Sequence, residues 1–276
     1  MTNKTLAIIK IILLLIVIFL LSGLLVALLI RQPLIINNTT KLLHSETITK
    51  DIKTINIEST SSDIYIKKSL SKDISYKIYG QNKQNINIDI SNDVLKINDR
   101  NNYANFQFFS SKDSRIELEV PENLIGKLNV KTISGDIKLL DEISLDVTIK
   151  STSGDVEIYK LQELIAQTTS GDLELNELSN GTLTTTSGDI EINKLTESCN
   201  INTLSGDVEI NTLALTKDSK ITTTSGSVEI KRTIDVYINH KTTSGKFDIF
   251  NNNRKSSHEL LITTTSGDIE VNSYDD

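Results

Sequence analysis

Eight copies of a short phrase recur along the second half of the chain, and the clearest reads TTTSGDIEI from Thr184 to Ile192. Each copy contains a Ser-Gly pair, and successive glycines lie 17 to 22 residues apart. The glycines are Gly135, Gly154, Gly171, Gly188, Gly206, Gly226, Gly245 and Gly267. Self-similarity at a near-fixed period predicts a repeat architecture, in which stacked units share a core that no unit could build alone.

Apolar and polar residues alternate on both sides of each glycine. In the copy at Gly188, Leu183, Ile190 and Ile192 mark one face, and Glu191 lies between the last two. A period of two indicates a half-buried strand, and Thr, Ile and Val favour the pleated sheet. Glycine can supply a positive φ at a sharp corner, and the leucine seven residues later, here Leu195, marks a second corner. We therefore predict an all-β, single-stranded β-solenoid, resembling a β-helix and right-handed by the crossover rule.

The N-terminal region predicts a membrane anchor. Only Ser22 and Gly23 interrupt the apolar series over residues 11–30, which is long enough to cross a hydrocarbon core of ~30 Å as a helix. A cleaved signal peptide is the alternative, but its apolar core spans only about 7–15 residues. Lys4 and Lys10 precede the segment, so we expect residues 1–10 to form a short cytoplasmic tail. The rest of this single-pass protein then lies on the extracytoplasmic side of the cell membrane.

The remaining chain divides by how regular its pattern is. Residues 31–52 are polar with scattered apolar positions and are predicted to form a spacer. Residues 53–276 are predicted to form the solenoid, irregular over 53–127 and regular over 128–276, with Ser62 standing where a glycine is expected. Within the irregular part, one aromatic cluster could cover the core or serve as a ligand patch. Its members are Tyr103, Phe106, Phe108 and Phe109.

Acidic residues repeat with the phrase, and they are the candidate metal ligands. An Asp follows most of the glycines directly, and a Glu usually comes two residues after that. In a solenoid equivalent residues stack at ~4.8 Å, so a Ca²⁺ ion could relieve the repulsion between them. The simpler interpretation is that each Asp caps its own turn and that the Glu column is a solvated face, with no metal bound. The ladder in question is Asp155, Glu157, Asp172, Glu174, Asp189, Glu191, Asp207 and Glu209.

Other classes of site have little support. The hydroxyl column three residues before each glycine, such as Thr185, points with the apolar residues and is expected inside. Cys199 falls on an inward position and is expected to be a buried hydrophobe. No catalytic arrangement, zinc spacing or phosphate loop is present, so no catalytic residue and no cofactor is predicted. Residues 32–276 hold 26 basic and 36 acidic residues, a balance that disfavours nucleic acid as a partner.

An apolar anchor, a run ending in Glu119-Val120-Pro121 and a ladder of Thr-x-Ser-Gly-Asp repeats together resemble the bacterial putative-adhesin family. The resemblance covers residues 52–276. It implies a β-solenoid envelope protein without established catalytic residues, sometimes linked to envelope stress. We therefore expect a non-enzymatic, membrane-anchored scaffold that binds the bilayer through residues 11–30 and a protein or wall polymer through its faces. The alternative is a carbohydrate-active β-helix enzyme, which would carry a groove with clustered acids.

Overall fold

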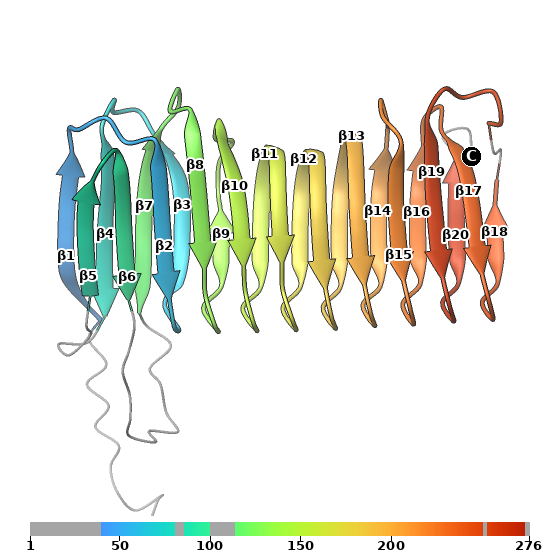
Figure 1. Ribbon diagram of the computed structural model, residues 1–276, viewed down its shortest axis with the longest axis horizontal. Coiled ribbons are helices and arrows are strands. Elements are labelled where there is room, and N and C mark those ends of the chain that lie inside the picture. The colour runs from blue at the N-terminus through green and yellow to red at the C-terminus, as the bar shows by residue number, and fades with distance from the viewer. Residues whose placement is uncertain (1–39, 81–85, 100–113, 251–252, 274–276) are drawn as a thin grey trace, which may run out of the picture. The chain divides into compact units, whose positions relative to one another are not determined.

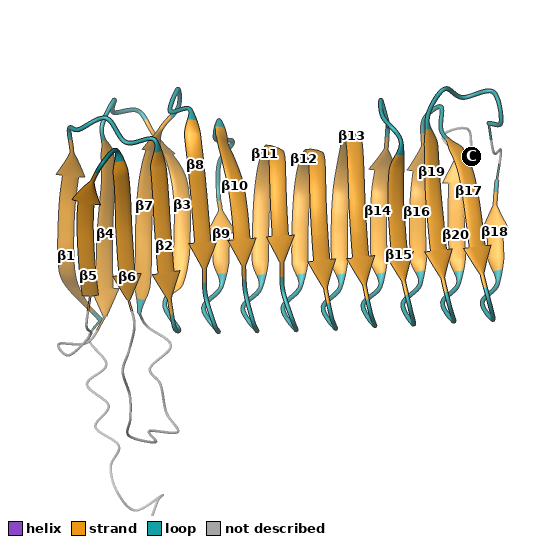
Figure 2. Cartoon of the chain, in the orientation of Figure 1, coloured by secondary structure: helices purple, strands orange, loops and turns teal. Residues whose placement is uncertain are grey.

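The computed structural model describes residues 40–80, 86–99, 114–250 and 253–273. These residues form twenty strands joined by turns, and no helix occurs among them (Figure 2). The strands are β1 (Lys41–Ile48), β2 (Thr54–Ser59), β3 (Asp63–Ser69), β4 (Ile74–Gly80), β5 (Ile86–Ser91), β6 (Val94–Asp99), β7 (Arg115–Pro121), β8 (Gly126–Lys131), β9 (Ile137–Leu139), β10 (Leu145–Lys150), β11 (Val156–Gln167), β12 (Leu173–Thr185), β13 (Ile190–Thr203), β14 (Val208–Leu213), β15 (Ser219–Thr223), β16 (Val228–Thr233), β17 (Tyr237–Thr242), β18 (Phe247–Ile249), β19 (Glu259–Thr264) and β20 (Ile269–Ser273). The prediction of an all-β fold is confirmed.

The strands form coils that stack side by side, with two facing layers around one core (Figure 1). The front layer in that view follows the order β6, β2, β8, β10, the second halves of β11, β12 and β13, then β15, β19 and β17. The back layer follows β7, β3, β9, the first halves of β11, β12 and β13, then β14, β16, β20 and β18. Neighbours within each of these runs are parallel.

Register between coils explains why the sequence repeats. Leu173 pairs with Ile190, which pairs with Val208, so equivalent inward residues lie next to one another in successive coils. The core is built from these columns, and almost every member is fully buried. Leu195 and its equivalents at the second corner are buried as well. The predicted alternation between core and solvent is therefore confirmed.

Coil order departs from chain order at both ends of the stack, which the periodicity of the phrase alone does not indicate. The coil of β2 and β3 lies between the coil of β6 and β7 and that of β8 and β9. The coil of β19 and β20 likewise lies between the coil of β15 and β16 and that of β17 and β18. At the C-terminal end, the coil with the full TTTSGD phrase thus packs on the regular array, and the divergent coil takes the terminal position, as is usual in repeat proteins.

Antiparallel strands close the N-terminal end. β1 pairs with β4, β4 pairs with β7, and β5 pairs with β6, all antiparallel. β1 falls in the stretch predicted to be a spacer, so residues 41–48 belong to the folded domain instead; Ile48 and Ile52 are buried in its core. The predicted membrane span over residues 11–30 lies outside the described residues, and the residues that are described include no helix able to cross a bilayer.

Glycine is required at the tight corners for a reason different from the one predicted. No described glycine has a positive φ. A Cβ on Gly188 would instead lie 2.0 Å from the carbonyl oxygen of Gly171 in the preceding coil, and the other corner glycines meet their neighbours in the same way. The constraint is close approach of two backbones, which any side chain would block. Ser62 occupies the equivalent position in the coil of β2 and β3, and the sequence between the neighbouring strands β6 and β7 contains no Ser-Gly pair.

We expect Gly188→Ala to lower the free energy of unfolding by at least ~3 kcal/mol, because the new methyl group displaces a neighbouring coil. Gly181→Ala is the matched control, since its Cβ would meet only the end of the Leu178 side chain, which can move. Urea denaturation of both variants measures the difference. Equal midpoints would show that the corner glycines are not close-packed.

Candidate functional site

A column of buried hydroxyl groups lies under the tight corners. In each corner the hydroxyl oxygen accepts a hydrogen bond from the backbone N–H three residues later, as Thr185 Oγ1 does from Gly188 at 2.8 Å. The predicted inward direction of this column is confirmed, but its bonds to N–H groups lie within one coil and not between coils. The buried members are Ser59, Thr132, Ser151, Thr168, Thr185, Thr203, Thr223 and Thr264. This column is part of the fold and offers no surface to a ligand.

Asp99 ends the hydroxyl column at its N-terminal side. It pairs in register with Ser59 and is fully buried. Its Oδ2 accepts a hydrogen bond from the Ser62 hydroxyl, while Oδ1 has no hydrogen-bond partner among the described residues. Burial raises the pKa of Asp99, and the Ser62 hydroxyl opposes that shift only in part. Among the described residues, Asp99 is therefore the acidic side chain that occupies a position of the hydroxyl column. This position could not be predicted before the coil order was known.

The Asp residues that follow the corner glycines form a carboxylate ladder. Each Oδ1 accepts a hydrogen bond from the backbone N–H of the equivalent residue in the next coil, at 2.7–3.1 Å. These acids therefore join one coil to the next, and do not cap their own turns as predicted. The members are Asp63, Asp136, Asp155, Asp172, Asp189, Asp207 and Asp268, with the Ser227 hydroxyl taking one place.

The Glu residues form a second column, the glutamate ladder, on the outer face of the back layer. Glu174 pairs with Glu191, and all six side chains are exposed or half-buried. Glu157 forms an ion pair with Lys138, and Glu209 forms one with Lys231. The ladder consists of Glu157, Glu174, Glu191, Glu209, Glu229 and Glu270. The eight predicted ladder acids thus divide into two columns with different roles, four Asp joining coils and four Glu facing outward.

A shallow groove of about 320 Å³ runs along the glutamate ladder. Besides Glu157, Glu174 and Glu191, its lining includes Tyr159 and Asn176. The Tyr159 side chain is 54% exposed, and Asn193 donates a hydrogen bond to Asn176 at 3.1 Å. Carboxylates, a ring and amides arranged in this way can bind hydroxyl or amine groups of an extended molecule. Tyr159 was not singled out from sequence, because it stands at an outward position that varies among the copies and is Asn in four of the other seven.

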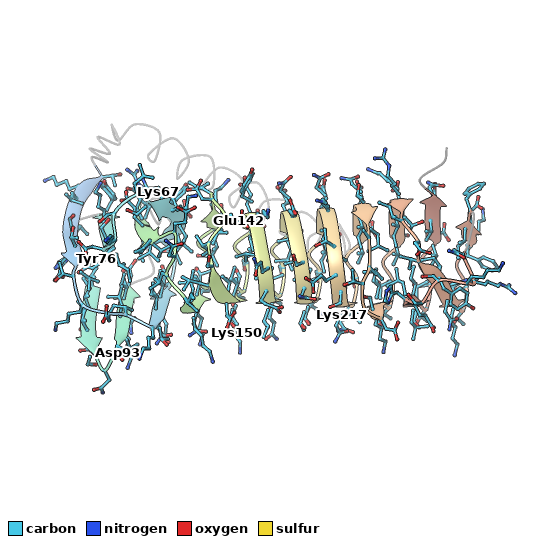
Figure 3. The ribbon with its side chains drawn as sticks, turned by 90° about the horizontal axis from the view of Figure 1, so that it is seen from above. Lys67, Tyr76, Asp93, Glu142, Lys150 and Lys217 are labelled. Atoms are coloured by element: carbon cyan, nitrogen blue, oxygen red, sulfur yellow. The ribbon has the colours of Figure 1, made fainter. Side chains whose placement is uncertain are left out.

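A second groove, of about 440 Å³, lies on the front layer and carries the opposite charge. Lys96, Lys131 and Lys150 line it, together with Glu58 and the amide pair of Asn56 and Asn129. Figure 3 shows Lys150 on one side of the stack and Glu142 on the other. No ion pair involving these three lysines occurs within the described ranges. This groove was missed from sequence, because only the displaced coil of β2 brings Lys96 and Lys131 to the same surface.

The remaining predicted residues are placed as follows. The aromatic patch of Tyr103, Phe106, Phe108 and Phe109 lies outside the described residues. Cys199 is buried as predicted, and burial raises the pKa of its thiol to about 12, which leaves it unreactive at neutral pH. Within the part of the chain that is described, no three His, Cys, Asp or Glu side chains meet in a way that could hold a metal ion.

Comparison with known proteins agrees with this geometry. Residues 52–272 match the family described as Toastrack DUF4097. The chain belongs to this family. The resemblance to putative adhesins is confirmed by a solved putative adhesin from Bacteroides fragilis, which is 18% identical over 84% of this chain and 97% of its own, with a TM-score of 0.57. A putative lipid binding protein from Parabacteroides distasonis is 16% identical over 86% of this chain and 98% of its own, with a TM-score of 0.52. At these identities the toastrack chain shares a fold with both. No curated protein matches it.

We expect Asp99→Asn to make the toastrack domain more stable than the wild type at pH 7, by an amount that shrinks as the pH falls. Because burial raises the pKa of Asp99, the folded state holds the proton more tightly than the unfolded state. The stability due to that proton is present at low pH and is lost as the pH rises through the folded pKa. Denaturation midpoints measured from pH 4 to 8 check this, with the exposed Asp89→Asn as control. A pH-independent difference would contradict it.

We expect millimolar Ca²⁺ to leave the melting temperature of the domain unchanged. The Asp oxygens already accept backbone N–H groups, and a flat row of Glu side chains does not supply the six to eight oxygens that Ca²⁺ takes. Binding to the folded state alone would raise the melting temperature. A rise of several degrees that a chelator reverses would overturn this prediction and make the glutamate ladder a metal site.

Proposed function

We propose that this toastrack protein is a non-enzymatic, membrane-anchored scaffold of the cell envelope, whose outer faces bind another protein or a wall polymer on the extracytoplasmic side. The observation that carries the proposal is the repetition of outward side chains in register. Glu174, Glu191 and their equivalents present one chemical group at the same place in successive coils. A surface of this kind suits an extended partner that repeats along its own length.

The same repetition argues against the alternative of a carbohydrate-active enzyme. Glycoside hydrolysis needs two carboxyl groups in different environments, one holding a proton and the other ionised. In the groove along the glutamate ladder, Glu174 and Glu191 occupy equivalent positions with equivalent neighbours. The ion pair with Lys138 favours the ionised form of Glu157, and nothing described in that groove marks Glu174 or Glu191 as the proton donor. The groove supports binding of hydroxyl or amine groups in a row.

Anchoring is proposed from the apolar segment at residues 11–30. The folded domain begins at β1, so only a short connection separates the proposed span from the first strand. The two structural relatives are described as a putative adhesin and a putative lipid binding protein, and both descriptions are of binding proteins. The folded domain would then be tethered to the membrane and available to envelope partners.

A pull-down from native envelopes with residues 40–276 as bait tests the proposal. The bait begins at residue 40 because β1 is part of the domain. Two double-variant baits show which surface binds the partner. The first carries Glu174→Gln and Glu191→Gln in the acidic groove, and the second carries Lys131→Gln and Lys150→Gln in the basic groove. We expect a partner protein or polymer that one variant loses and the other retains. Cleavage of envelope polysaccharide by the bait, or capture equal for all three baits, would contradict it.

A further inference from the structure

The outward face of the front layer carries almost no acid, although the chain as a whole has a net charge of −7. Two rows of outward side chains cross this layer from β6 to β17, one in register with Lys150 and one in register with Thr148. Within the described strands these rows hold a single acid, Glu58. We call the two rows together the front track. Its lysines are Lys96, Lys131, Lys150, Lys220 and Lys241.

The rest of the front track is a surface of hydrogen-bonding groups. Apart from Ile165 and Leu261, its other members are Asn, Gln and Thr, and neither row contains an aromatic side chain. Asn129 Nδ2 donates to Asn56 Oδ1 at 2.8 Å, which uses one amide N–H and leaves the other amide N–H groups of this pair as donors. The track therefore offers cations and hydrogen-bond donors, and no ring on which a ligand could stack.

The lysines of the front track differ from lysines of the back layer because they have no carboxylate partner. In the first halves of β11 and β13, the Nζ atoms of Lys160 and Lys194 lie 3.9 and 3.4 Å from the same oxygen of Glu177. None of the five track lysines forms an ion pair with a described residue. Lys131 and Lys150 instead pair in register with each other, an arrangement of like charges that costs stability. A bound anion would relieve this repulsion.

The spread of the lysines indicates the shape of such an anion. Lys96, Lys131 and Lys150 line the groove of about 440 Å³ at one end of the track, whereas Lys220 and Lys241 lie on β15 and β17. At ~4.8 Å between neighbouring strands, the front track is ~43 Å long from β6 to β17. A single small anion cannot reach all of these ammonium groups. A ligand that uses the whole track is elongated and carries negative charge at intervals along its length.

Acids border the front track and limit the path of such a ligand. Asp89 lies on β5, beside the β6 end of the track. Asp146 and Glu163 lie two residues before Thr148 and Ile165, in the next outward row of β10 and β11. These carboxylates repel a polyanion. The favourable path therefore runs along the two rows, parallel to the axis of the stack.

We propose that the front track binds a linear wall polymer whose acyclic repeating unit carries a phosphodiester, with the polymer lying along the stack. Each phosphodiester supplies one negative charge and oxygens that accept hydrogen bonds from ammonium, amide and hydroxyl groups. An acyclic backbone needs no aromatic platform, whereas the bases of single-stranded nucleic acids stack on one. This inference rests on the proposed function, since the polymer must be within reach of the domain, and it names the partner of one face.

Binding of fluorescently labelled poly(glycerol phosphate) to the purified full-length chain in non-ionic detergent, measured by anisotropy at several salt concentrations, tests the inference. We expect Lys131→Gln with Lys150→Gln to weaken binding at least about tenfold and to make it less dependent on salt. Lys160→Gln with Lys194→Gln is the matched control, because it removes the same charge from the back layer. The control should bind like the wild type. A wild type that does not bind, or an equal loss in both double variants, overturns the proposal.

The length of the probe tests whether the ligand follows the whole track. We expect Lys220→Gln with Lys241→Gln to weaken binding of polymers longer than ~43 Å, but not of short oligomers that cover only the groove. An equal effect on both lengths would refute the path along the stack. Polygalacturonate, oligo-dT and micelles that contain phosphatidylglycerol serve as competitors, and tighter binding of any of them than of poly(glycerol phosphate) would overturn the assignment of the ligand.

These results can be separated from those of the envelope pull-down, because only purified chain and defined probes are present. If poly(glycerol phosphate) fails to bind while the pull-down still captures a partner, this inference fails and the proposed function stands. If the pull-down captures nothing from the envelope, the proposed function itself fails.

Discussion

Close approach of two backbones at the tight corner is the constraint on which the rest of this fold depends. The corner glycines stack so that each Cα faces the carbonyl oxygen of the glycine in the preceding coil, with no space for a Cβ. The hydroxyl three residues earlier holds the glycine N–H, and the Asp that follows holds the next coil. Thr, Gly and Asp of the Thr-x-Ser-Gly-Asp phrase therefore have separate mechanical roles: the hydroxyl orders its own corner, the glycine permits the close spacing between coils, and the Asp joins one coil to the next. Selection for that spacing is sufficient to explain why the phrase repeats.

This division of roles determines which residues remain available for function. One oxygen of each ladder Asp accepts a backbone N–H group of the next coil, and the hydroxyl column is buried, so both columns contribute to the fold. Outward positions between the inward columns are not constrained by the corner. They carry the glutamate ladder on the back layer and the lysine groove on the front layer. The lysine groove lies over β6, β2, β8 and β10, and the acidic groove lies over β9 and the first halves of β11, β12 and β13, so the two grooves present opposite charges on different layers.

The inward columns and the buried hydroxyls could be predicted from sequence because they depend on periodicity alone. Ile190 and Thr185 are buried because they fall on the inward positions of the two-residue alternation that the copies share. Coil order could not be predicted from sequence. The coil of β19 and β20 carries the same phrase as the coils that follow chain order, so nothing in its sequence marks it as displaced. The role of Asp189 was mistaken because a carboxylate can reach its own turn or the next coil, and only the stacking distance decides between them. Lys96 and Lys131 meet through the same displaced order at the N-terminal end.

Deviations from the repeat become informative once the coil order is known. Lys246 and Phe247 depart from the phrase in adjacent positions. In the sequence they belong to a copy that is not the last one, so they resemble random variation in an interior repeat. The structure puts that copy at the end of the stack of described coils, where no described strand beyond β17 and β18 extends the carboxylate ladder or covers the core. A residue that is wrong for an interior coil can therefore be suited to a terminal one. The same reasoning applies at the other end, where Ser62 stands in place of glycine and its hydroxyl donates a hydrogen bond to Asp99, which pairs in register with Ser59.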